Sequence, residues 1–66
     1  MKRYEVVFLR ALTEHERAHG VFGPVSEVEY VLAKTKTAGL RWQRSIAKER
    51  GWRSMDIREV EVVQPT

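Results

Sequence analysis

The chain has 66 residues, of which 42% are apolar and 32% are charged, values typical of one small globular domain. It contains no cysteine, which excludes disulfide bonds and thiolate metal sites and is typical of an intracellular, cytoplasmic protein. Its 12 Lys and Arg against 9 Asp and Glu give a net charge of +3, which permits a nucleic-acid partner without requiring one.

The first expected strand, residues 4–10, carries apolar side chains on both of its faces. One row is Tyr4, Val6 and Phe8, and the other is Val7 and Leu9. A strand that is apolar on both faces is usually central in its sheet. Its uninterrupted apolar run has only four residues, so we expect no membrane span, no targeting segment and no membrane partner.

The following segment, residues 11–25, allows two interpretations. Thr13 and Glu16 form a T-x-x-E capping box, and Gly20 can end a short helix that starts there. Alternatively, the segment is the tip of a long hairpin between the first two strands. In both cases Gly23-Pro24 marks a turn.

The same segment contains HERAH, which matches the H-E-x-x-H pattern of zinc hydrolases. In those enzymes a helix places two histidines one turn apart, and the glutamate activates a metal-bound water. A catalytic zinc needs a third protein ligand, and here Glu27 and Glu29 follow only across the Gly-Pro turn. We therefore expect exposed histidines, no catalytic residues, no metal and no cofactor. A zinc hydrolase that uses His15, Glu16 and His19 is kept as the last alternative.

Two further strands are expected, at residues 26–34 and 56–63. In the first of them, apolar and acidic side chains alternate. The apolar row is Val28, Tyr30 and Leu32, and the acidic row is Glu27 and Glu29. In the last strand, Val60 and Val62 lie opposite Glu59 and Glu61. Ile57 is out of phase with these valines, so we expect a bulge or a late strand start near it.

A helix is expected between the second and third strands. Thr35 or Thr37 can cap its start, and Gly51 can end it in the left-handed conformation. One apolar arc contains Ala38, Gly39, Trp42 and Ile46. We expect this helix to pack on the sheet with Trp42 and Ile46 at its centre, and Trp52 to fold back on Ala47 and Ile46.

The order strand, strand, helix, strand predicts an α+β fold with a three-stranded antiparallel sheet, formed as a single domain over residues 1–66. On the helix, Arg41, Arg44 and Lys48 fall together opposite the apolar arc. With Arg53 they form the candidate partner-binding site, since such a cluster can hold phosphates or an acidic protein patch. The alternative is a solvated helix face that has no partner.

The segment from residue 29 to residue 63 resembles small accessory proteins of tailed bacteriophages, including transcription inhibitors that bind host RNA polymerase. The shared features are the topology, Ala33-Lys34-Thr35, Gly51-Trp52 and the closing valine strand, over about half the chain. The resemblance implies a non-enzymatic, host-modulating protein that binds a larger protein or a protein–nucleic acid complex. Those inhibitors tend to be acidic on the binding surface, whereas this helix is basic. A nucleic-acid-binding module is the alternative, and oligomerisation through an exposed sheet edge is left open.

Overall fold

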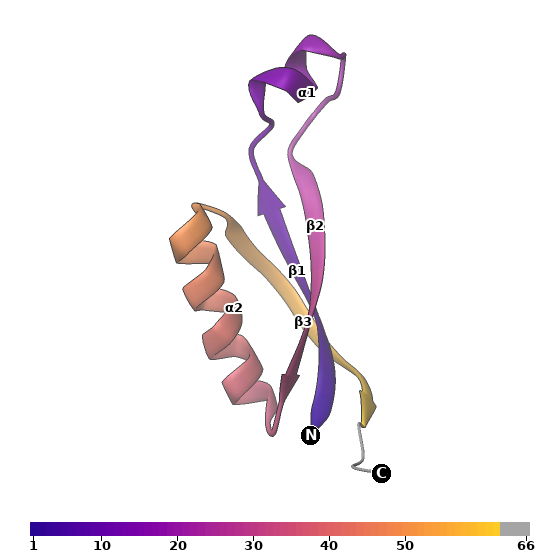
Figure 1. The fold of residues 1–66 in the computed structure, drawn as a ribbon, viewed down its shortest axis with the longest axis vertical. Coiled ribbons are helices and arrows are strands. Elements are labelled where there is room, and N and C mark those ends of the chain that lie inside the picture. The colour runs from indigo at the N-terminus through magenta and orange to yellow at the C-terminus, as the bar shows by residue number, and fades with distance from the viewer. Residues whose placement is uncertain (63–66) are drawn as a thin grey trace.

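The structure is a computed structural model and describes residues 1–62. Its elements are β1 (Lys2–Arg10), α1 (Glu14–Ala18), β2 (Val25–Ala33), α2 (Lys36–Arg50) and β3 (Arg53–Val62). The strands form an antiparallel sheet in the order β2-β1-β3, and α2 packs beside it (Figure 1). The predicted α+β fold and its β-β-α-β order are confirmed. Val63, the expected end of the last strand, lies outside the described residues.

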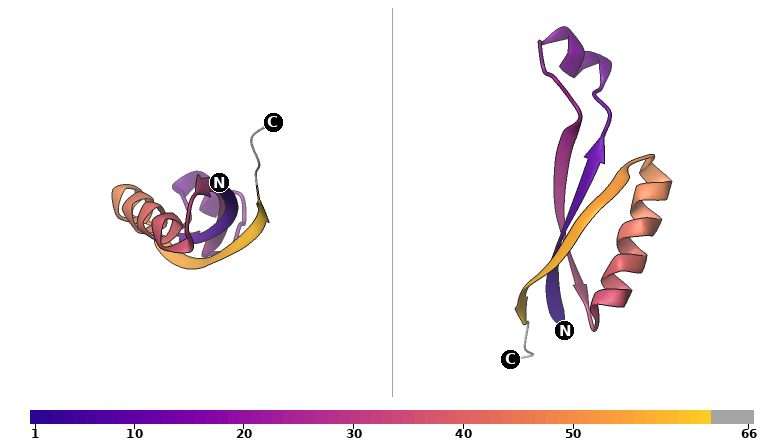
Figure 2. Two further views of the ribbon diagram at one scale, coloured as in Figure 1. Left: turned by 90° about the horizontal axis from the view of Figure 1, so that it is seen from below. Right: turned by 180° about the vertical axis from the view of Figure 1, so that it is seen from behind.

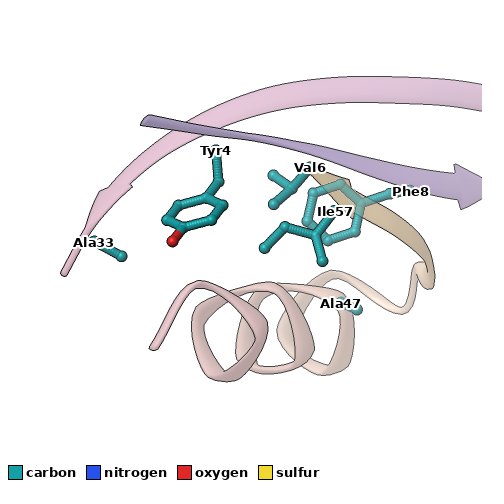
Figure 3. Close-up of a cluster of buried hydrophobic side chains, with 6 residues drawn as sticks. All are labelled: Tyr4, Val6, Phe8, Ala33, Ala47 and Ile57. Carbon is teal, nitrogen blue, oxygen red and sulfur yellow. The ribbon is translucent and has the colours of Figure 1, made fainter. Parts of the chain in front are cut away.

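β1 is the central strand, as its two apolar faces predict. Tyr4, Val6 and Phe8 are at most 1% exposed and form the centre of the core. Figure 3 shows these side chains between the sheet and α2, with Ile57 of β3 beside them. The face of the sheet that carries them is therefore the one that α2 covers, and we term the other side of the sheet the open face.

α2 begins and ends at its capping residues. Thr35 is the N-cap, and its hydroxyl accepts a hydrogen bond from the N–H of Ala38 at 3.2 Å. Gly51 ends the helix in the left-handed conformation, with φ of 70°. The N–H of Trp52 donates to the carbonyl of Ala47 at 2.8 Å, and the chain then continues into β3.

The side of α2 that packs on the sheet differs from the predicted one. Gly39, Gln43 and Ala47 are the buried residues of the helix, whereas Trp42 and Ile46 are only partly buried against the core. The predicted centre is therefore wrong by about one residue around the helix. Both apolar side chains still contact the core, but from its margin.

A close approach between helix and sheet accounts for this rotation. A Cβ atom on Gly39 would lie 2.9 Å from Cδ1 of Ile57, so the two elements meet where the helix has no side chain. An indole such as that of Trp42 does not fit into so small a gap and packs at its side. Ala38, expected in the apolar arc, is exposed.

Gln43 is buried where β1 and β3 change register. Val7 pairs with Asp56, and the next pair skips Met55, which is the extra residue of a bulge. The Gln43 side-chain amide donates to the Val7 carbonyl at 3.1 Å and to the Asp56 carbonyl at 2.7 Å. The bulge expected near Ile57 is thus confirmed, and a helix side chain binds the carbonyls beside it.

β3 begins at Arg53, three residues before its predicted start. Ile57 is its contribution to the buried core. A second register shift, between Arg3 and Tyr4, skips Val60, which is 38% exposed. Val60 therefore does not join Ile57 in the core.

β2 shows the predicted alternation, but its apolar row lies on the open face. Val28, Tyr30 and Leu32 are 48%, 59% and 49% exposed. Glu27 and Glu29 pair with buried residues of β1, so they lie on the side of α2. The row Val28, Tyr30 and Leu32 is therefore left uncovered, while Val31 and Ala33 of the same strand pack toward α2.

The hairpin of β1 and β2 extends beyond α2 and carries α1 at its tip (Figures 1 and 2). We term this extension, centred on residues 11–24, the arm. The molecule is consequently elongated, with extents of 46 × 22 × 16 Å. Thr13 is the N-cap of α1, and both hydrogen bonds of the capping box with Glu16 are present. The two interpretations of residues 11–25 are thus combined, because a short helix forms the tip of a hairpin.

Candidate binding surface

Three basic side chains form a line along the solvent side of α2. Arg41, Arg44 and Lys48 are exposed. On the helix, Arg41 and Lys48 lie opposite the buried Gln43, and Arg44 lies to one side, about 100° from it. They are three and four residues apart, so they follow one another along the axis at intervals of about 4.5 Å and about 6 Å. We term these three residues the basic stripe. Because α2 packs through its other side, the stripe faces solvent.

Carboxylates neutralise many of the cations on the sheet and the arm. The pairs are Lys2–Glu59, Arg3–Glu61, Arg10–Glu16, Arg10–Glu27, Arg50–Glu29 and Arg58–Glu5. Among residues 1–62, the basic stripe takes part in none of these ion pairs. The outer side of α2 thus carries three unpaired cations in a row, whereas the other unpaired cations of the described chain, Arg17, Lys34, Lys36 and Arg53, lie apart from this row.

Arg53 does not extend the basic stripe. It pairs with Leu9 of β1, and cross-strand partners project to the same face of a sheet. Leu9 follows Phe8, whose side chain is in the core under α2, so Leu9 and Arg53 project to the open face. The candidate site of four residues is thereby divided between two sides of the molecule.

Both tryptophans belong to the margin of the core. The rings of Trp42 and Trp52 meet Phe8 edge to face, with centroid distances of 6.4 Å and 5.4 Å. The guanidinium of Arg50 lies 4.9 Å from the centroid of the Trp52 ring. Trp52 thus contacts both Phe8 and Arg50. A base could stack on the ring face that Arg50 covers only by displacing that cation.

Glu16 of the HERAH segment is held by Arg10. The guanidinium donates to both carboxylate oxygens, at 2.7 Å and 2.9 Å, and the N–H of Thr13 donates to one of them at 2.9 Å. These hydrogen bonds, that of Arg10 above all, lower the pKa of Glu16 to about 2. A carboxylate with so low a pKa is a weak general base at neutral pH. Glu16 serves here as a helix cap and as an ion-pair partner.

His15 and His19 are exposed, as predicted. Their ring centroids are 4.2 Å apart, and Nδ1 of His19 lies 2.8 Å from the carbonyl oxygen of His15. In the described part of the chain, no three His, Cys, Asp or Glu side chains are grouped so that they could hold a metal ion. The structure thus brings the two histidines together but places no third ligand beside them.

The open face is a surface that the sequence does not reveal. Alternation on β2 would normally place Glu27 and Glu29 in water and the apolar row against the helix. Instead, Arg10 and Arg50 bind these glutamates at 2.7 Å and 2.8 Å and hold them on the side of α2. The partners are 17 and 21 residues apart in sequence, so only the folded chain shows this arrangement.

No protein family, curated protein or solved structure matches the chain. Within residues 1–62, no helix has both the length and the apolar character needed to cross a membrane. Function is therefore inferred from the surfaces described above.

Proposed function

We propose that the protein is a small, non-enzymatic binding protein that docks through the basic stripe on an acidic surface of a larger protein. The main support is the separation of charge. Glutamates neutralise most cations of the sheet and the arm, with Arg17 and Arg53 as the exceptions, whereas Arg41, Arg44 and Lys48 stay unpaired within the described residues and follow one another along one helix.

The composition of α2 favours a binding surface over a solvated helix face. A solvated face usually mixes charges of both signs. α2 contains five basic residues and a single acidic one, Glu49. Of the five, Arg50 is paired with Glu29. Of the other four, Arg41, Arg44 and Lys48 leave a positive field along the outer side of the helix, with Lys36 at its first turn, in a molecule whose net charge is only +3.

An acidic protein patch suits the basic stripe better than single-stranded nucleic acid does. Proteins that bind single strands combine cations with exposed aromatic rings on which the bases stack. Here Trp42 and Trp52 pack on Phe8 at the core margin. A duplex, which cations can bind through its phosphates without stacking on aromatic rings, is the nucleic-acid alternative.

The resemblance to phage accessory proteins supports a host-modulating role. We propose accordingly that the protein acts in the cytoplasm, on a larger protein or a protein–nucleic acid complex, without a cofactor and without a membrane partner. Binding would occupy the outer side of α2 and leave the sheet untouched.

The test is capture of partners from a cell lysate by the immobilised parent and by two variants with equal changes of charge. Arg44→Glu/Lys48→Glu reverses two charges of the basic stripe and should lose the captured protein. Arg17→Glu/Lys34→Glu reverses two exposed cations that lie outside the basic stripe and the open face, and it should retain the captured protein. Circular dichroism should show both variants folded, since all four side chains are exposed.

Nuclease treatment separates the two classes of partner. A protein that is still captured after nuclease supports the acidic-patch assignment, whereas loss of all capture after nuclease assigns the stripe to nucleic acid. Equal capture by the parent and by Arg44→Glu/Lys48→Glu would show that the stripe is not the contact surface.

A further inference from the structure

The open face is apolar at its centre. The apolar side chains there are Val7, Leu9, Val28, Tyr30 and Leu32, of which the three on β2 are about half exposed. A depression of about 300 Å³ at its β2 side is lined by Arg3, Tyr30, Val31 and Leu32. Contiguous apolar surface of this kind is rare on monomeric proteins and marks a site of interaction.

The pattern of β2 indicates that this face is covered by something. In an antiparallel sheet with one solvated face, the apolar row faces the core and the polar row faces water. β2 departs from this arrangement: its side toward α2 mixes Val31 and Ala33 with Glu27 and Glu29, which Arg10 and Arg50 bind, while its open-face row Val28, Tyr30 and Leu32 is apolar. The exposed apolar row of β2 is the pattern expected of a strand whose open face is covered by a second layer.

The charges of the open face are balanced. Arg3 is paired with Glu61 at 2.8 Å, and the guanidinium of Arg58 donates to both oxygens of Glu5. Arg53 and Asp56, which pair with Leu9 and Val7 in the register of β1 and β3, add one charge of each sign. The face is thus neutral, so two copies meet here without the repulsion that two basic stripes would cause.

We propose that a second copy of the chain covers the open face, in a two-fold symmetric dimer with the two sheets packed against each other. A neutral face that carries both signs of charge can complement itself across a two-fold axis. The α2 helices then lie on the two outer sides, so the dimer presents two basic stripes to solvent. Dimerisation does not require that either stripe binds a partner.

The dimensions of the sheet suit such an interface. A strand of nine residues is about 30 Å long, and three strands are about 14 Å wide at the usual spacing. The footprint is therefore roughly 400 Å² per copy, or about 800 Å² for the pair before side-chain relief is counted, which is close to the ~1,000 Å² of a specific interface. Among residues 1–61, six buried side chains form the hydrophobic core under α2, and domains of this size often gain stability by association.

Sedimentation velocity of the full chain, from low micromolar to submillimolar concentration, tests the proposal. The parent should sediment as a dimer at the upper end of this range. Tyr30→Thr/Leu32→Thr removes apolar area from the open face while keeping a residue that favours strands, and it should sediment as a monomer. Phe22→Ser is the control, because Phe22 is 94% exposed at the arm tip, and it should stay dimeric. A parent that is monomeric throughout, or a double variant that dimerises like the parent, overturns the proposal.

Distances between spin labels locate the interface. The chain has no cysteine, so Ser26→Cys and Ser45→Cys each give one labelling site. Ser26 lies on the open face, opposite Leu9, and Ser45 is exposed on α2. In the proposed dimer, two labels at position 26 are closer to each other than two labels at position 45. The reverse order would place the interface on another surface and overturn the proposal.

Discussion

Gln43 shows how one side chain joins the helix to the sheet. It is 2% exposed and is the single buried polar residue among those described. Its amide donates to two carbonyls, Val7 and Asp56, beside the bulge in β3. Buried carbonyls without a donor are destabilising, so the irregular strand and the polar helix residue depend on each other.

Replacement of this amide should therefore destabilise the fold. Gln43→Met keeps most of the volume but leaves both carbonyls without their donor, so we expect the free energy of unfolding in urea to fall by about 2 kcal/mol or more. Arg44→Met, at the neighbouring exposed position, is the control and should change stability by about 0.5 kcal/mol at most. Equal stability of the two variants would show that the Gln43 hydrogen bonds are not needed.

Glu16 makes the stability of the folded arm depend on pH. Its pKa is about 2 in the folded chain, below its usual value of 4.5, chiefly through the Arg10 hydrogen bonds. A lowered pKa stabilises the folded state above about pH 4.5, and this contribution is lost as the pH falls toward about 2. Glu16→Gln should melt below the parent near neutral pH, and the difference should shrink in this acid range. Arg10→Gln should remove the same pH dependence, and parallel melting curves of parent and Glu16→Gln would contradict the assignment.

At the scale of elements, the sequence predicts the features that follow from periodic side-chain patterns and from capping residues. Alternation identifies the central strand by the Tyr4, Val6 and Phe8 row, and capping residues mark the start of α2 at Thr35 and its end at Gly51. The rotation of α2 is not predictable in this way, because it depends on contact between Gly39 and a strand that follows the helix.

The candidate site is likewise predictable only in the part that depends on periodicity. The basic stripe follows from the helical period alone, and its three side chains are exposed as expected. The position of Arg53 depends on the register of β3 against β1, which a bulge resets. The uncovered apolar row of β2 depends on ion pairs between distant residues, and no local pattern encodes these.

Because α2 is rotated, its aromatic contacts differ in how much they contribute to stability. Phe8 is fully buried and touches both tryptophans, whereas Trp42 is partly buried. We therefore expect Phe8→Ala to abolish folding or nearly so, and Trp42→Ala to lower the free energy of unfolding by about 2–4 kcal/mol, a large part of the stability of so small a domain. Phe22→Ala at the arm tip should have little effect. Thermal melting measures all three, and a Trp42→Ala variant that melts within a few degrees of the parent would contradict the packing of α2.

At the scale of the whole molecule, the sheet separates two surfaces of different character. α2, which carries the basic stripe, lies on one side of the sheet (Figure 1), and the neutral, apolar open face is the other side. The stripe attracts acidic surfaces over a range of about one Debye length, ~8 Å at physiological salt. The open face is suited to association at short range. The two surfaces can therefore be occupied together.

Binding of a defined polyanion, followed by NMR on the uniformly labelled chain, tests the assignment of the basic stripe most directly. Two probes are titrated separately at low salt, a polyglutamate peptide and a short DNA duplex. The largest shift changes should fall on Arg41, Arg44 and Lys48, should fade as salt is added, and should spare Tyr30 and Leu32 on the open face. Shift changes concentrated on the arm or the open face, or none on α2 with either probe, would contradict the assignment.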